Sequence, residues 1–243
     1  KVTGVQTCAL PISRLCGYAR RVADIEHCSE TCETQLAFIR DGRAKGFHFH
    51  SWWIDAGWYP CTLPPEKRPA TPSWVADKPT HWFYTGDWRP DPARFPQGLK
   101  PIADELARED AELLLWFEPE RIFAGLGTEG MPDDWWIKLP GNVNSLLNLG
   151  NQDCRQALTD KINRQIRENG IRVYRQDFNF DPLPYWRQAD AAQGAQRQGI
   201  SENLYIQGYL AYWDALLAAN PGLWIDSCSS GGRRNDLETM RRA

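Results

Sequence analysis

Acidic residues directly follow three apolar, strand-like segments of the sequence. The clearest lies at 171–182, where β-branched and aromatic residues lead to Asp177, and the same order recurs at 52–55 and 113–120. One such case would be a strand followed by a solvated loop acid. Three cases favour a different interpretation, in which parallel strands direct catalytic carboxylates to one edge of a barrel.

The elements that would position these acids alternate along the chain. Strands are predicted at 47–54, 113–117, the start of 171–182, and 223–226, and helices at 34–45, about 101–109, 153–169, 203–219 and 237–242. Alternation of this kind indicates βαβ units and a parallel sheet. We therefore expect the α/β class and a (β/α)8 TIM-type barrel. It is incomplete in this chain, because a closed barrel needs eight strands.

Three stretches stand outside this alternation. Residues 58–86 form a long, proline-rich loop that we expect to shape one side of the barrel mouth. Residues 125–151 are expected to be irregular. Residues 1–13 fit nothing downstream and resemble a translated sequencing adaptor, so we assign the partial catalytic domain to 14–243.

Composition excludes several classes of function. The net charge of −3 argues against nucleic acid as a partner, and no apolar run reaches the roughly 18 residues of a membrane span. The 12 Trp residues suit sugar stacking, although core packing should account for most of them. The seven Cys show no paired metal-binding spacing, which predicts reduced thiols, no metal, no cofactor and a cytoplasmic location.

Four motifs then occur in a specific order. They are WIDAGW at 53–58, LWFEPE at 115–120, YRQDFN at 174–179 and DSCSSGGR at 226–233. In these motifs the chain resembles the catalytic barrel of glycoside hydrolase family 36, the bacterial α-galactosidases, from about residue 35 onward. The resemblance implies a retaining mechanism, in which a carboxylate nucleophile and a carboxylic acid lie about 5–5.5 Å apart.

By this resemblance Asp177 is the nucleophile, and Asn179 follows it at the family's spacing. The family usually has Lys and then Trp where this chain has Arg175 and Gln176. We expect the neighbouring guanidinium of Arg175 to contact the sugar and to keep Asp177 ionised.

The resemblance also implies a set of sugar-binding residues. Asp55 matches the first of two adjacent acids that bind sugar hydroxyls, and Ala56 replaces the second. Trp116 matches a binding Trp that could stack on the sugar, with core packing as the alternative. Cys228 and Gly231 belong to a loop that the family places near the sugar 2-position.

The remaining acids receive other roles. Glu118 and Glu120 are interpreted as bracing the barrel mouth. The resemblance implies that the general acid lies beyond Ala243, in a Trp-x-Ser-Asp stretch, so the chain alone is not expected to turn over substrate. Asp236 is the second choice, although it suits a helix N-terminus beside two arginines that would lower its pKa.

The resulting hypothesis is a retaining α-galactosidase-like hydrolase whose partner is an oligosaccharide or glycoside. Ala56, Arg175 and Gln176 leave open an enzyme for another sugar, such as an α-N-acetylgalactosaminide. A non-catalytic carbohydrate-binding barrel is the alternative from a different class, and Asp177 together with the Cys228 loop argues against it. A homo-oligomer of the parent protein is a further possibility that the sequence does not decide.

Overall fold

The computed structural model describes residues 26–68, 78–124, 126, 128 and 130–243. The predicted adaptor-like segment at 1–13 lies outside the described residues, as does the middle of the proline-rich loop. Within the described residues, no helix combines the length and apolar composition that crossing a membrane requires.

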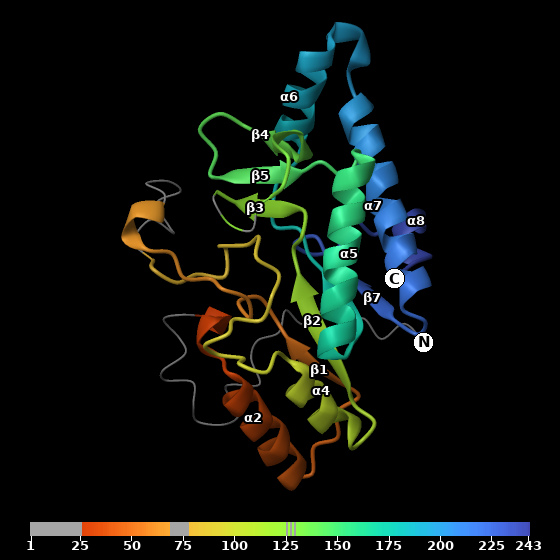
Figure 1. Cartoon of the computed structure of the whole chain (residues 1–243). Helices are drawn as coiled ribbons and strands as arrows, with labels where there is room; N and C mark the ends of the chain where they lie inside the picture. The colour runs from red at the N-terminus through yellow and green to blue at the C-terminus, as the bar shows by residue number, and fades with distance from the viewer. Residues whose placement is uncertain (1–25, 69–77, 125, 127, 129) are drawn as a thin grey trace.

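Four parallel strands form the main sheet. In spatial order they are β1 (Ser51–Ile54), β2 (Glu112–Phe117), β6 (Ile171–Gln176) and β7 (Trp224–Ser227). All four were predicted, and the helices that precede them in turn are α2 (Cys32–Ala44), α4 (Lys100–Ala107), α5 (Gln152–Asn169) and α7 (Ile200–Ala219). The fold is therefore a (β/α)8-type barrel that is not closed by the described residues, with helices on one face of the sheet (Figure 1).

Local sequence signals fix the central unit, α5 followed by β6. The Asn151 side chain accepts hydrogen bonds from the amides of Asp153 (2.9 Å) and Cys154 (3.1 Å), which caps the start of α5. Gly170 ends the helix in the left-handed conformation, with φ of 67°, which a glycine adopts without steric cost. The chain therefore turns directly from α5 into β6.

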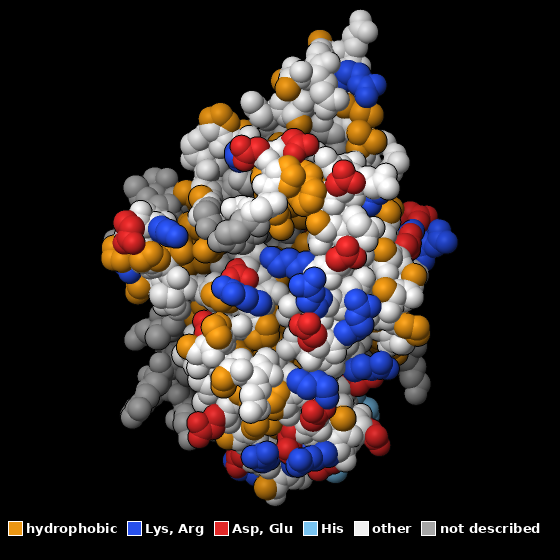
Figure 2. All heavy atoms as spheres, in the orientation of Figure 1, with side chains coloured by type: hydrophobic (Ala, Val, Ile, Leu, Met, Phe, Trp, Pro, Cys, Tyr) orange, Lys and Arg blue, Asp and Glu red, His pale blue; other side chains and the backbone are white. Residues whose placement is uncertain are grey.

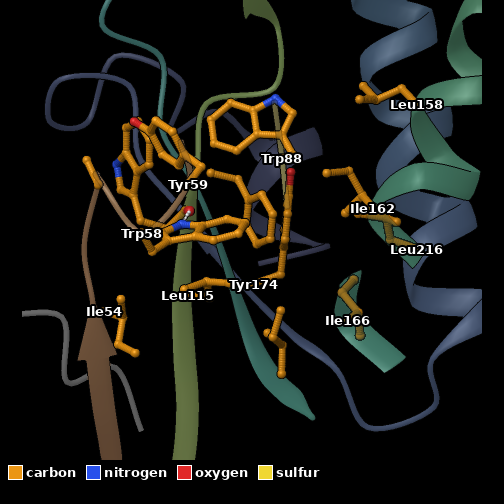
Figure 3. Packing of buried hydrophobic residues seen from close by; sticks show 14 of the residues in the cluster. Ile54, Trp58, Tyr59, Trp88, Leu115, Leu158, Ile162, Ile166, Tyr174 and Leu216 are labelled. Carbon is orange, nitrogen blue, oxygen red and sulfur yellow. Dashed lines mark hydrogen bonds between the residues drawn. The ribbon is translucent and has the colours of Figure 1, made fainter. Parts of the chain in front are cut away.

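Apolar side chains on α5 hold the helix against the sheet. Leu158, Ile162 and Ile166 recur at helical spacing, are buried, and point toward the strands (Figure 3). Leu115 on β2 and Tyr174 on β6 are fully buried members of the same cluster. This face of the sheet is therefore the core, and the opposite face is left for the interior of the barrel.

A second sheet corrects the expectation for residues 125–151. β3 (Arg121–Phe123), β5 (Asn144–Leu147) and β4 (Trp136–Lys138) pair antiparallel in that order, beyond the end of β2 (Figure 1). The prediction of irregular structure was wrong because strands of three or four residues are too short to show a clear period-2 pattern.

Helix α6 (Leu183–Gln193) is likewise absent from the sequence prediction. Pro182 is its N-cap residue, and β6 already ends at Gln176. The remaining elements are short: η2 (Glu26–Ser29), η3 (Pro65–Lys67), η4 (Asp133–Trp135), η5 (Ala195–Arg197) and α8 (Leu237–Met240).

The surface has a face of mixed charge and an exposed apolar side chain at the edge of the main sheet. On the face shown in Figure 2, acidic and basic side chains are intermingled, as expected for a net charge of −3. Trp224 on the edge strand β7 is 71 % exposed, which is unusual for so large an apolar side chain. The β7 edge of the sheet thus presents apolar surface in the described part of the chain.

Close packing of α7 gives a test of the fold. A Cβ added at Gly208 would lie 1.9 Å from the carbonyl oxygen of Leu149, so Gly208→Ala must displace backbone. Helix propensity alone would stabilise the variant by about 1 kcal/mol. We expect overpacking to dominate and to lower the free energy of unfolding by about 1–3 kcal/mol.

Urea unfolding monitored by Trp fluorescence measures this difference. Gln207→Ala, at an exposed neighbouring position on the same helix, is the matched control and should change stability little. A stabilised Gly208→Ala variant would show that the contact between α7 and Leu149 is looser than described.

Candidate active site

The carboxyl ends of the four parallel strands gather the predicted site residues at one edge of the sheet. Asp55 follows β1, Glu118 follows β2, Asp177 follows β6 and Cys228 follows β7. The strands are parallel neighbours in that order, so their ends meet at the same edge. The prediction that separate strands direct carboxylates to one edge is confirmed.

Asp177 lies at the centre of this edge and is 8 % exposed. Its Oδ1 accepts hydrogen bonds from the amides of Phe178 (2.7 Å) and Ser230 (3.0 Å). Its Oδ2 accepts from Nε1 of Trp116 (3.2 Å) and Nδ2 of Asn179 (3.0 Å). Donors from three segments distant in sequence therefore converge on one carboxylate.

These donors control the charge of Asp177. Burial alone would raise the pKa of Asp177, because it disfavours the charged form. Hydrogen bonds from Ser230, Asn179, Phe178 and the Cys228 thiol outweigh burial and hold this pKa below its ordinary value. The carboxylate is therefore ionised at neutral pH, as a nucleophile must be.

Arg175 was expected to hold Asp177 ionised. The larger contributions come from the hydrogen bonds to Asp177, and the ion pair of Arg175 is with Asp226, whose Oδ2 lies 2.5 Å from Nη1. Burial opposes the charge of Arg175, and the neighbouring Asp226, Cys228 and Asp177 together raise its pKa nonetheless. The guanidinium also lies 4.9 Å from the ring centroid of Trp53, on the barrel-interior face of the sheet.

Gln176 lies on the other face. Its side chain is fully buried, accepts from Nε1 of Trp213 (2.7 Å) and the hydroxyl of Tyr174 (2.8 Å), and donates to Glu120 (2.7 Å). The amide is thus a structural group of the core. It gives no support to the idea that Gln176 bears on the choice of sugar.

Trp116 is buried within an aromatic cluster. Tyr59 stacks against it with ring centroids 6.2 Å apart, and the rings of Trp82 and Trp88 lie at 6.1 and 6.0 Å. Figure 3 shows Tyr59 and Trp88 beside Trp58, beyond the end of β1. This environment favours the core-packing alternative for Trp116, and stacking on a sugar stays a prediction.

The loop after β7 supplies Cys228 and Gly231. Burial raises the pKa of the Cys228 thiol, so the sulfur stays protonated and is not activated as a nucleophile. Gly231 has a φ of 100°, a conformation that favours glycine, and its amide hydrogen bonds to the Cys228 sulfur. The loop amide that reaches Asp177 is that of Ser230, which the sequence analysis did not single out.

Asp55 is half-buried at the end of β1, and its Oδ1 accepts from the Ala56 amide (2.8 Å). Ala56 itself is buried in the apolar core cluster. The side chain that replaces the second acid of the family pattern is therefore part of the packing, and Asp55 is the acid at this strand end.

Glu118 and Glu120 are both fully buried and paired, in agreement with a bracing role. Glu118 accepts from Nη2 of Arg121 and from the Asn179 amide, both at 2.5 Å. Glu120 forms an ion pair with Arg234, with Nη1 and Nη2 at 2.6 and 3.0 Å. Arg234 therefore pairs with an acid 114 positions away and not with Asp236, its neighbour in sequence.

Asp236 is the N-cap of α8. Its Oδ1 accepts from the amides of Glu238 (2.8 Å) and Thr239 (2.9 Å), and the Thr239 hydroxyl accepts from the Asp236 amide in return. This is the helix N-terminal position that the sequence predicted.

A family model and the sequences of individual proteins both match this chain, and they agree with each other. The sequence model of the family described as Melibiase matches residues 73–243. Alpha-galactosidase 1 of Pediococcus pentosaceus is 27 % identical over 157 residues, which are 62 % of this chain and 21 % of that protein. The α-galactosidase of Escherichia coli is 25 % identical over 163 residues, or 65 % of this chain and 22 % of that protein. The chain thus spans about a fifth of the length of these relatives.

Solved structures agree on the fold. A variant of the α-galactosidase AgaA from Geobacillus stearothermophilus, in complex with 1-deoxygalactonojirimycin, superposes with a TM-score of 0.68 at 19 % identity. The match covers 88 % of this chain and 28 % of the other.

The lowered pKa of Asp177 should make the free energy of unfolding depend on pH in the acid range. Because its folded-state pKa lies below the ordinary 3.8, the ionised group stabilises the fold above pH 3.8. That contribution is lost as the pH falls through the lowered folded value. We expect the difference in free energy of unfolding between wild type and Asp177→Asn to be constant near neutral pH. Below pH 3.8 the wild type should lose stability relative to the variant.

Urea titrations at a series of pH values measure this difference. A difference that stays constant from neutral pH to pH 3 would show that the folded pKa of Asp177 is not lowered.

Proposed function

The chain belongs to the Melibiase family, and on this premise we propose that the whole protein is a retaining α-glycosidase acting on terminal α-linked galactosides. The observation that carries the proposal is Asp177, a buried strand-end carboxylate kept ionised by five hydrogen-bond donors. Several similar proteins are named α-galactosidases, and solved relatives hold galactosides such as stachyose and raffinose.

In the proposed reaction one oxygen of Asp177 attacks the anomeric carbon of the sugar. The bond to the leaving oxygen breaks as a general acid gives that oxygen a proton, and a covalent glycosyl ester forms. Water, deprotonated by the same acid–base group, then attacks the anomeric carbon and releases Asp177. Two inversions give net retention.

The surrounding residues have proposed binding roles. Asp55 would accept hydrogen bonds from sugar hydroxyls at the end of β1. Arg175 retains N–H groups beyond the one that it gives to Asp226, and these would donate to the sugar from the interior face. Asn179 and the loop at Cys228 and Gly231 would border the site on the other side. No metal or cofactor takes part in this scheme.

The test of the nucleophile is chemical rescue in the full-length protein. Asp177→Gly should remove essentially all turnover of an aryl α-galactoside, because no covalent ester can form. Azide should restore cleavage through the vacated space and give a β-galactosyl azide, a product of inverted configuration.

Asp181→Gly is the matched control. Asp181 is an exposed acid four positions further along, and its Oδ1 caps Leu183 at 3.2 Å. This variant should retain near-wild-type turnover and give no azide product. Near-wild-type turnover by Asp177→Gly would show that Asp177 is not the nucleophile.

The position of Asp236 yields a second test. As an N-cap it should act on stability, so we expect Asp236→Ala to lower the free energy of unfolding by about 1 kcal/mol. Turnover of activated aryl galactosides and of galactosides with poor leaving groups should then fall by the same factor. A loss confined to poor leaving groups would identify Asp236 as the general acid instead.

A further inference from the structure

The loop after β7, residues 228–234, is anchored at both ends. At its start the Cys228 amide continues the sheet by donating to the Gln176 carbonyl at 2.8 Å. At its far end Arg234 binds Glu120 through both terminal nitrogens, at 2.6 and 3.0 Å. The strand end and a bidentate ion pair therefore define the path of the loop.

The far anchor is rigid because every group in it is packed. Glu120 is 0 % exposed and also accepts from Gln176 Nε2 (2.7 Å) and from the Tyr205 hydroxyl. The guanidinium of Arg234 lies between two rings, 4.2 Å from the centroid of Phe178 and 4.6 Å from that of Tyr209. A Lys at this position would keep the charge but lose the planar fork and the stacking.

Between the anchors the chain adopts a costly conformation. Ser230 has a φ of 46°, in the left-handed region that a non-glycine residue enters at a free-energy cost. Its amide points at Oδ1 of Asp177 from 3.0 Å, and its hydroxyl hydrogen bonds to Oδ1 of Asn179. Such a conformation persists only where the surrounding structure holds it.

We propose that Arg234 is a positioning residue for the nucleophile: its ion pair with Glu120 holds the loop so that the Ser230 amide and the Cys228 thiol donate to Asp177. Arg234 does not itself touch the reacting atoms. The expected change in kinetics rests on the proposed function. The expected change in the position of the Ser230 amide rests on geometry alone.

Charged groups at the neighbouring strand ends make their contacts outside the loop, so they should not mask the effect. Asp55 after β1 accepts from the Ala56 amide. Arg175 on β6 is bound to Asp226 on β7, and Glu118 after β2 is bound to Arg121. The fifth donor, Nε1 of Trp116, comes from β2 and does not depend on the loop. Loosening the loop should therefore remove the Ser230 and Cys228 donors and leave the rest.

The test is Arg234→Lys in the full-length protein, assayed on an aryl α-galactoside across pH. Loss of donors to a charged acceptor should lower kcat/KM about 10- to 100-fold. The acid limb of the pH profile should move upward by roughly one pH unit, because Asp177 loses groups that favour its ionised form. A purely structural role would lower the amount of active enzyme without moving that limb.

Arg242→Lys is the matched control. Arg242 also forms a bidentate pair, with Asp214 at 2.7 and 2.9 Å, and its side chain has the same 14 % exposure as that of Arg234. This pair joins the end of the chain to α7 away from Asp177. The control should leave the acid limb in place, and an equal shift in both variants would overturn the proposal.

Two further measurements keep the result decisive. If Arg234→Lys does not fold, the double variant Glu120→Gln/Arg234→Gln leaves no unpaired buried charge and should show the same shift. A crystal structure of whichever variant folds should show Ser230 N more than 3.5 Å from Asp177 Oδ1, the distance limit of a hydrogen bond. An unchanged contact overturns the proposal, whereas an inactive wild type overturns only the proposed function.

Discussion

The carboxylate of Asp177 is almost fully buried, yet it must carry a charge to act as a nucleophile. Burial pushes its pKa upward, and only hydrogen bonds from neighbouring groups reverse that effect. The donors come from β2, from the turn after β6 and from the loop after β7. Each donor is in place only if the strands keep their register, so the parallel sheet, its helices and its loops all serve this one charge.

Four strand ends carry acids or donors, but their chemistry differs. Glu118 and Glu120 are each neutralised by a guanidinium, of Arg121 and Arg234, and are therefore structural. Asp177 is held by an indole, amides and a thiol, which stabilise a negative charge without cancelling it. That contrast separates the proposed nucleophile from the bracing acids better than position in the sequence does, because Glu118 and Asp177 both directly follow a strand.

Sequence patterns predicted the four parallel strands and their helices because each carries a local signal: helical spacing on α5, the Gly170 C-cap, and apolar runs before each acid. The small antiparallel sheet carries no such signal, since its strands have three or four residues. Contacts across the chain were also beyond reach. Glu120 and Arg234 are 114 positions apart, and no local pattern reports the left-handed backbone of Ser230.

Adjacent residues on a strand face opposite sides of a sheet, and this rule separates the two departures from the family pattern on β6. Arg175 faces the barrel interior with Asp226 and Trp53. Gln176 faces the core, where its amide joins Glu120, Tyr174 and Trp213. A change at 176 therefore repacks the core beneath the strand end, whereas a change at 175 alters the groups that face the barrel interior. If the proposed function holds, Arg175 is therefore the one of the two at which a difference in sugar preference would arise.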